Sequence, residues 1–188
     1  MYEQIQRACE SLRRQGFDSI DTGLVLGTGL GALPPAFSVQ HTVGFDAIDG
    51  FRPASAPGHS GTLSVGEWHG RRVLILQGRF HLYEGLSAAE VVRPVYVLRA
   101  LGARSLIVTN AAGGLNPAFA PAELMLITDH LNFTGVNPLS GVDDERLGPR
   151  FPDLSRAYAP ALRRRALEAA AAAGIALRQG IYAAVHGP

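Results

Sequence analysis

The stretch Gly78-Arg79-Phe80-His81-Leu82-Tyr83-Glu84-Gly85 follows an apolar run, Val73-Leu74-Ile75-Leu76-Gln77. The short apolar run predicts a buried β-strand. Between its two glycines, the octet offers a guanidinium, an imidazole, a phenol and a carboxylate. Arg79 and His81 are two residues apart, so in an extended chain they point to the same side. An arginine fork fits phosphate or carboxylate oxygens, so the octet favours an anion site. The alternative for the octet alone is an Arg–Glu pair that stabilises a turn.

Strand and helix patterns alternate on both sides of this octet, which predicts an α/β fold. Residues 62–68 alternate in polarity, and a tight turn at His69-Gly70 joins them to the apolar strand. This hairpin predicts that the sheet is mixed rather than purely parallel. Further strands are expected at 24–26, 105–109, 124–128 and 180–185, with helices ending before Gly16, running from Ser87 to Leu101, and covering 161–173. We expect the strand at 105–109 to be buried and 132–154 to be a long functional loop.

The composition indicates a compact chain without a highly charged surface. Its 188 residues are 47% hydrophobic and 18% charged, with a formal net charge of +1. These values predict one domain and give no electrostatic indication of a nucleic-acid or membrane partner. Cys9 is the one cysteine, and its place on an apolar helix stripe predicts a core residue. The N-terminus lacks a signal-peptide pattern, so we expect a cytoplasmic protein.

Three further motifs could contact a ligand. The glycine-rich turn Gly27-Thr28-Gly29-Leu30-Gly31-Ala32 follows a strand, and its backbone N–H groups and Thr28 hydroxyl can hold a phosphate oxygen. It also fits a dinucleotide-binding pattern, but Pro34-Pro35 would break the helix that such a motif requires. His59 lies between two glycines ahead of a strand. Asn110-Ala111-Ala112-Gly113-Gly114 places small residues at a strand end, where they suit either a ligand or close packing.

Together these motifs resemble the trimeric purine nucleoside phosphorylases over nearly all of the chain. The resemblance rests on Leu26 to Gly31, Pro57 to Gly61, Gln77 to Gly85, Thr109 to Pro117, Asp129 to Asn132, Asn137 to Leu139 and Asp144 to Arg146. It implies a mixed central β-sheet, partly barrel-like and flanked by helices, in a homotrimer. It also implies phosphorolysis of a purine nucleoside to free base and ribose 1-phosphate. Phosphate would be a co-substrate, and no other cofactor and no metal is expected.

The resemblance further implies a role for individual residues. Phosphate would be bound by Thr28, His59, Arg79, His81 and the backbone of Ala111. The nucleoside would be bound by Tyr83, Asn110 and Ala112, and by Phe151, which would close a neighbouring subunit's site. Arg79 and His81 are the expected catalytic residues, and Glu84 would orient Arg79 or a neighbour. Threonine stands at position 28 where the family usually has serine, and it keeps the hydroxyl.

The family continues beyond the position of Pro188, so we expect residues 1–188 to form a single phosphorylase domain that is incomplete at its C-terminus. The residues that read the purine would lie in the missing part, so a preference for 6-oxopurines (inosine, guanosine) follows from the resemblance alone. One alternative is a truncated, non-catalytic relative that binds phosphate or only assembles with itself. A methylthioadenosine phosphorylase is disfavoured by the form of the motif Phe80 to Gly85. A dinucleotide-binding oxidoreductase would rest on the glycine turn alone.

Overall fold

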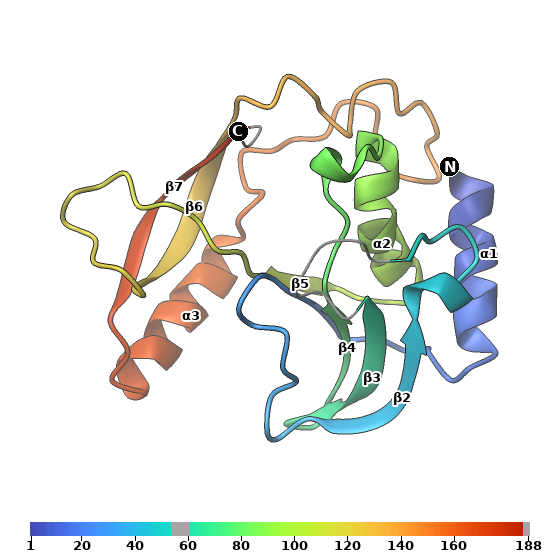
Figure 1. Cartoon of the computed structure of the whole chain (residues 1–188), viewed down its shortest axis with the longest axis horizontal. Coiled ribbons are helices and arrows are strands. Elements are labelled where there is room, and N and C mark those ends of the chain that lie inside the picture. The colour runs from blue at the N-terminus through green and yellow to red at the C-terminus, as the bar shows by residue number, and fades with distance from the viewer. Residues whose placement is uncertain (54–60, 186–188) are drawn as a thin grey trace. The chain divides into compact units, whose positions relative to one another are not determined.

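The computed structural model describes residues 1–53 and 61–185 of the chain (Figure 1). The chain divides into two compact units, Met1–Ala111 and Ala112–Pro188. Both contain helices and strands, and the predicted α/β class with a mixed sheet is confirmed. The single-domain organisation and the barrel-like closure stay predictions. In the parts of the chain that are described, none of the helices has the length and apolarity to cross a bilayer.

The first unit contains a five-stranded mixed sheet. Its strands are β1 (Thr22–Leu26), β2 (Ser38–Gly44), β3 (Thr62–Trp68), β4 (Arg71–Gln77) and β5 (Ser105–Val108), in the order β2-β3-β4-β1-β5. Strands β2, β3 and β4 pair antiparallel, whereas β4, β1 and β5 pair parallel. The predicted β3–β4 hairpin is confirmed. Its turn residues His69 and Gly70 have φ values of 49° and 71°, as the favoured two-residue hairpin turn requires.

Two helices cover one face of this sheet (Figure 1). They are α1 (Tyr2–Arg13) and α2 (Ala88–Ala100). The apolar stripe of α1 is buried, including Cys9 as predicted, and the Cys9 thiol lies 3.9 Å from the Val97 carbonyl of α2. Helix α2 packs on β1 at Gly23, where an added Cβ would lie 2.9 Å from the Leu98 side chain. The glycine therefore allows close contact between helix and strand.

The other face of the sheet is covered by the segment that follows β1. Leu24 and Leu26 alternate with the helix-facing residues of β1, and they cluster with Phe37, Val73 and Ile75. Leu33 packs against the same cluster, as does Trp68. The chain after the glycine turn therefore folds back onto the sheet instead of forming a helix, as the Pro34-Pro35 pair predicts.

Two strands at the ends of the sheet differ from the expectations. Strand β2 was not predicted, because five of its seven residues are exposed and it lacks an apolar run. Strand β5 was predicted to be buried, but Leu106, Ile107 and Val108 are 38%, 51% and 53% exposed. Among the described residues β5 pairs with β1 alone. An edge strand has one neighbour in place of two, so an apolar sequence there does not secure burial.

The second unit consists of a parallel strand pair, one helix and long connections. Strands β6 (Leu124–Asn132) and β7 (Leu177–Ala184) pair in parallel, and α3 (Pro160–Ala172) connects them. The long connection expected over 132–154 is confirmed, since the described residues 133–159 lie outside helices and strands. Strand β6 runs further than predicted, so Asp129 and His130 lie inside the strand and not after it.

Ser87→Ala should lower the free energy of unfolding by about 1 kcal/mol, because it removes the N-cap of α2. The Ser87 hydroxyl accepts a bond from the Glu90 N–H, and the Glu90 carboxylate accepts one from the Ser87 N–H at 2.9 Å. The carboxylate also accepts a bond from the Ser87 hydroxyl at 2.7 Å, and the two bonds that it accepts from Ser87 hold the pKa of Glu90 below its ordinary 4.5. A lowered carboxyl pKa stabilises the fold above pH 4.5 and loses that effect as the pH falls through the lowered value. Urea unfolding at pH 7 and pH 3 should show the difference between wild type and variant narrowing at acid pH. Ser11→Ala, inside α1, is the control and should not lower stability.

Candidate functional site

Three of the motifs predicted to contact a ligand start at the carboxyl ends of the parallel strands of the five-stranded sheet. In the parallel register Leu26 lies beside Gln77, and Val25 lies beside Val108. The glycine turn after β1, the octet after β4 and the Asn110 segment after β5 therefore start next to one another. Ligands commonly bind at the carboxyl ends of parallel strands, because loops and unpaired backbone groups gather there.

The glycine turn makes close backbone contacts with both neighbouring segments. A Cβ at Gly27 would lie 2.3 Å from the Thr109 carbonyl oxygen and 2.9 Å from both Arg79 Nη1 and the Asn110 Cα. Gly29 has a φ of 83°, which favours glycine. Gly27 is buried, whereas Thr28 and Gly29 are exposed. The turn thus exposes Thr28, while the guanidinium of Arg79 lies against the buried Gly27.

Gly27→Ala should lower the free energy of unfolding by about 1–3 kcal/mol and displace the Arg79 side chain, because the new methyl group would overlap backbone. Thermal or urea unfolding measures the first effect. Gly113→Ala is a matched control, since no heavy atom lies within 4 Å of its Cβ position among the residues described. Equal stability of the two variants would contradict the close approach at Gly27.

Arg79 carries a buried cationic nitrogen. Its Nη1 atom is buried and has no hydrogen-bond partner within residues 1–53 and 61–185. Leaving a charged donor unpaired inside a protein is unfavourable. An anionic oxygen bound between the glycine turn and Asn110 would satisfy it.

Phe80 anchors the octet in a cluster of aromatic side chains. Its ring is 5% exposed and packs edge-to-face against Phe45 at 5.3 Å and Phe51 at 5.7 Å between centroids. Phe45 and Phe51 also pack against each other at 5.7 Å. Because Phe80 lies between Arg79 and His81 in the sequence, this cluster fixes the backbone that carries both candidate residues.

Glu84 orients His81. The expectation was that this carboxylate orients either Arg79 or a neighbouring residue, and that neighbour is His81. Glu84 Oε1 lies 2.7 Å from His81 Nδ1 and accepts a bond from the His81 N–H at 2.8 Å. The Tyr83 ring stacks on the imidazole with centroids 4.6 Å apart and planes 18° apart. Tyr83 is itself 75% exposed. Glu84 and Tyr83 belong to the short helix η2 (Leu82–Glu84), so one turn carries the ring and both of its contacts.

The structure brings some predicted site residues together, places two others in the second unit and leaves one undescribed. Arg79 and Asn110 both lie against Gly27, next to Thr28, and the Asn110 side chain donates to the Ala111 carbonyl at 3.2 Å. His59 lies outside the described residues. Ala112 and Phe151 belong to the second unit, where Phe151 is 87% exposed.

Two side chains that contact the glycine turn, Gln77 and Thr109, were missed by the sequence reasoning. The available signal was that each is a polar residue at the end of an apolar strand.

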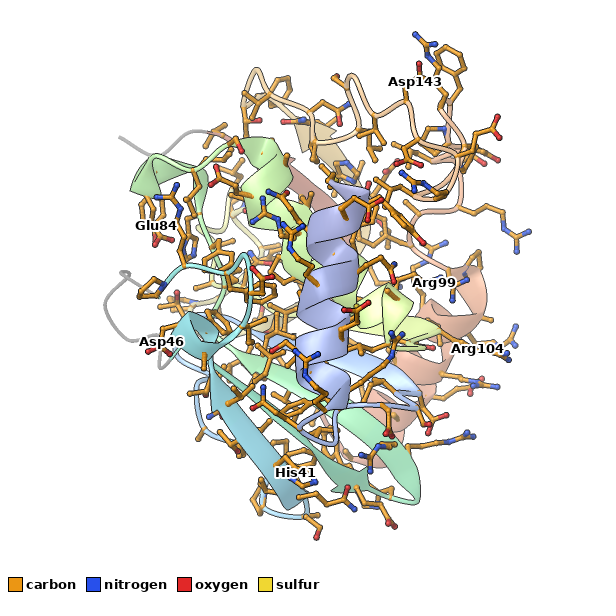
Figure 2. The ribbon with its side chains drawn as sticks, turned by 90° about the vertical axis from the view of Figure 1, so that its right-hand side faces the viewer. His41, Asp46, Glu84, Arg99, Arg104 and Asp143 are labelled. Carbon is orange, nitrogen blue, oxygen red and sulfur yellow. The ribbon has the colours of Figure 1, made fainter. Side chains whose placement is uncertain are left out.

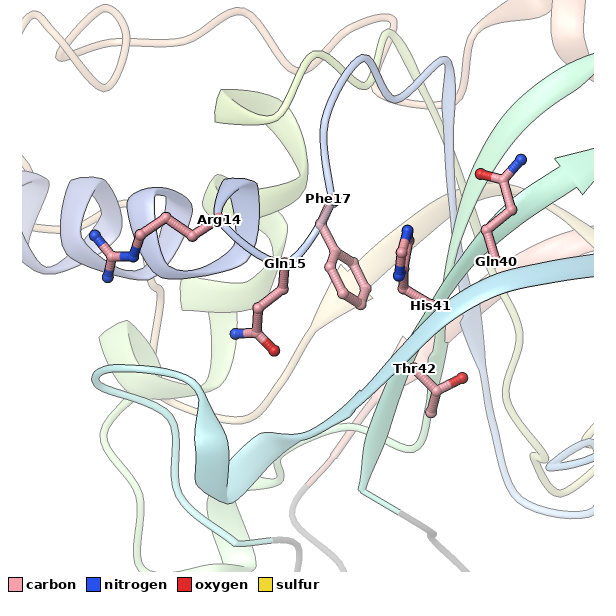
Figure 3. Close-up of a pocket in the computed structure, with 7 residues that line it drawn as sticks. Arg14, Gln15, Phe17, Gln40, His41 and Thr42 are labelled. Atoms are coloured by element: carbon pink, nitrogen blue, oxygen red, sulfur yellow. The ribbon is translucent and has the colours of Figure 1, made fainter.

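A separate open hollow lies at the end of α1, beside β2 (Figure 3). It has a volume of about 620 Å³ and is lined by Arg14, Gln15, Gly16, Phe17, Gln40, His41 and Thr42. None of the predicted site residues that the structure describes lines it, so it is distinct from the candidate site.

Comparison with known proteins gives the family. Residues 21–188 match the phosphorylase superfamily. The chain is 44% identical to purine nucleoside phosphorylase 1 of Geobacillus stearothermophilus, over 98% of this chain and 67% of that protein. It is 43% identical to purine nucleoside phosphorylase 1 of Bacillus subtilis, over 100% of this chain and 69% of that protein. The chain thus spans about two thirds of the length of these relatives.

Solved structures agree with the sequence relatives. A purine nucleoside phosphorylase from Schistosoma mansoni in complex with acetate matches with a TM-score of 0.91 at 36% identity, over 99% of this chain and 70% of that chain. Isoform 2 from the same organism, in complex with cytosine and ribose-1-phosphate, matches with a TM-score of 0.89 at 36% identity, over 100% of this chain and 67% of that chain. The chain therefore belongs to the purine nucleoside phosphorylase family within the phosphorylase superfamily.

Proposed function

We propose that this chain is a purine nucleoside phosphorylase, a pentosyltransferase that converts purine ribonucleosides and 2'-deoxyribonucleosides to free base and (deoxy)ribose 1-phosphate. The observation that carries the proposal is the buried, unpartnered Nη1 of Arg79 beside the glycine turn, among the described residues. A structural neighbour in complex with ribose-1-phosphate, the product of this reaction, supports it.

In the proposed reaction a phosphate oxygen attacks the anomeric carbon as the glycosidic C–N bond breaks. The bonding electrons leave with the purine, which takes up a proton, and the sugar develops positive charge in the transition state. A phosphate held under the anomeric carbon stabilises that charge and then captures it. Cationic, hydroxyl and amide donors are the groups that hold such an anion.

The proposed site assigns each predicted residue to one part of the substrates. Phosphate contacts are Thr28, His59, Arg79, His81 and the backbone of Ala111. Nucleoside contacts are Tyr83, Asn110, Ala112 and, from a neighbouring subunit, Phe151. Glu84 acts through His81, whose ring it contacts. The catalytic residues are Arg79 and His81.

The proposal extends to substrate choice, assembly and location. The substrates are 6-oxopurine nucleosides, inosine and guanosine, in purine salvage. The enzyme is a cytoplasmic homotrimer that uses phosphate as co-substrate, without a metal or other cofactor.

The test is base release by the purified chain from inosine, with and without phosphate. Phosphate-dependent release of hypoxanthine together with ribose 1-phosphate supports the proposal, and release without phosphate contradicts it. Adenosine and methylthioadenosine in parallel test the substrate preference. If no nucleoside is cleaved while calorimetry still detects phosphate binding, the non-catalytic alternative replaces the enzyme.

A further inference from the structure

Both ends of the glycine turn are held by a side chain from a neighbouring strand end. Thr109 Oγ1 accepts a hydrogen bond from the Gly27 N–H at 2.9 Å and donates one to the Val25 carbonyl at 3.0 Å. At the other end, Gln77 Nε2 donates to the Gly31 carbonyl at 2.8 Å. Three residues, Thr28 to Leu30, lie between Gly27 and Gly31, so the two bonds enclose the part of the turn that carries Thr28.

The Gln77 amide is itself held by a chain of hydroxyl groups. Its Oε1 atom accepts bonds from Thr62 at 3.2 Å and from Ser64 at 3.1 Å. Ser64 is fully buried and lies 3.0 Å from the Thr42 hydroxyl. A serine hydroxyl has one proton, so when Ser64 donates to Gln77 the Thr42 hydroxyl donates to Ser64. The NH₂ group of Gln77 must face Gly31, because the Gly31 carbonyl can only accept a hydrogen bond. This requirement fixes which way the Gln77 amide is turned.

We propose that Gln77 and Thr109 are positioning residues that preorganise the glycine turn for phosphate. This inference rests on the proposed function. The turn contains Thr28 and Gly29, both exposed, with Gly29 at positive φ, and glycine-rich backbone of this kind has many accessible conformations. Fixing its ends before the anion arrives removes an ordering penalty from binding and keeps the N–H groups and the Thr28 hydroxyl in place.

The test compares variants that remove or restore the bonds to the glycine turn. Thr109→Val keeps the shape and removes the hydroxyl, Thr109→Ser restores it, and Gln77→Met keeps the length without the amide. Thr42→Val makes the same change as Thr109→Val, but on the edge strand β2, three hydrogen bonds away from the turn. All four are made in the full chain, with folding checked by circular dichroism.

Two readouts separate positioning from general structural damage. Inorganic phosphate binding, measured by calorimetry, should weaken about three- to tenfold in Thr109→Val and Gln77→Met, as expected for the one neutral hydrogen bond to the glycine turn that each variant loses. It should stay within about twofold of wild type in Thr109→Ser and Thr42→Val. Hydrogen exchange of the amides in residues 27–31 should accelerate in the first two variants and not in the last two. In turnover assays the phosphate KM should rise while kcat at saturating phosphate is kept.

The outcomes distinguish this inference from the proposed function. A wild-type chain that binds no phosphate overturns both. A wild-type chain that binds phosphate, with Thr109→Val and Gln77→Met binding it equally well, overturns this inference and leaves the proposed function standing. Faster exchange without weaker phosphate binding also overturns it, as does an equal loss of affinity in Thr42→Val.

Discussion

Phe80→Ala should lower the free energy of unfolding of this chain by about 3–5 kcal/mol, the range for truncating a buried phenylalanine. The Phe80 ring is 5% exposed and touches Phe45 and Phe51 edge-to-face, so the variant loses apolar burial and two aromatic contacts together. Its backbone also joins Arg79 to His81, so phosphate binding should weaken even where the variant remains folded. Urea unfolding measures the first effect, and calorimetry with phosphate measures the second.

The matched control for this substitution is Phe133→Ala, which removes the same side chain where it is 65% exposed. That variant should stay within about 0.5 kcal/mol of wild type. Phe80→Leu keeps most of the apolar volume and should fall between the two. A Phe80→Ala variant as stable as Phe133→Ala would show that the aromatic cluster does not anchor the octet.

Sequence patterns predicted the middle of the sheet well and its ends poorly. Strand β4 is a continuous apolar run, the pattern that predicts a strand buried on both faces. Strand β3 alternates in polarity, the pattern that predicts a strand with one buried face. Strand β2 lacks that signal, since its exposed residues are held by pairing with β3 and not by burial. Strand β5 has the apolar sequence of a buried strand but lies at the edge of the sheet. There its exposure depends on which distant parts of the chain pack against it, and the sequence of the strand does not reveal that.

The chemistry of the candidate site could be predicted from residue types, but its geometry could not. The glycine turn and the arginine-histidine octet each indicate an anion site without any structure. Their meeting depends on β1 lying between β4 and β5, an order that does not follow the chain. Thr109 and Gln77 stand out in the sequence only as polar residues at strand ends. Their role could not be predicted, because their partners Gly27 and Gly31 are 82 and 46 residues away.

Arg79→Ala should weaken phosphate binding about ten- to a hundredfold, the effect of losing one charge-assisted hydrogen bond of about 1.5–3 kcal/mol. The guanidinium lies against Gly27, and its Nη1 atom lacks a protein partner in the described part of the chain. A donor in that position is available to an anion without first breaking a bond to the protein. Removing it should therefore change phosphate affinity strongly and stability little. Calorimetric titration with phosphate and the phosphate KM in turnover measure the effect.

Two further variants separate the shape of the arginine from its charge. Arg79→Lys keeps the positive charge but replaces the planar fork by a single ammonium group, so it should recover only part of the affinity. Arg104→Ala removes the same charge from an exposed residue just before β5. Figure 2 shows Arg104 on the opposite side of the view from Glu84. Because salt screens charges that are far from the site, Arg104→Ala should change phosphate affinity less than twofold at physiological ionic strength. If Arg104→Ala weakened phosphate as much as Arg79→Ala, affinity would follow the net charge of the chain, and the guanidinium beside Gly27 would not be the phosphate contact.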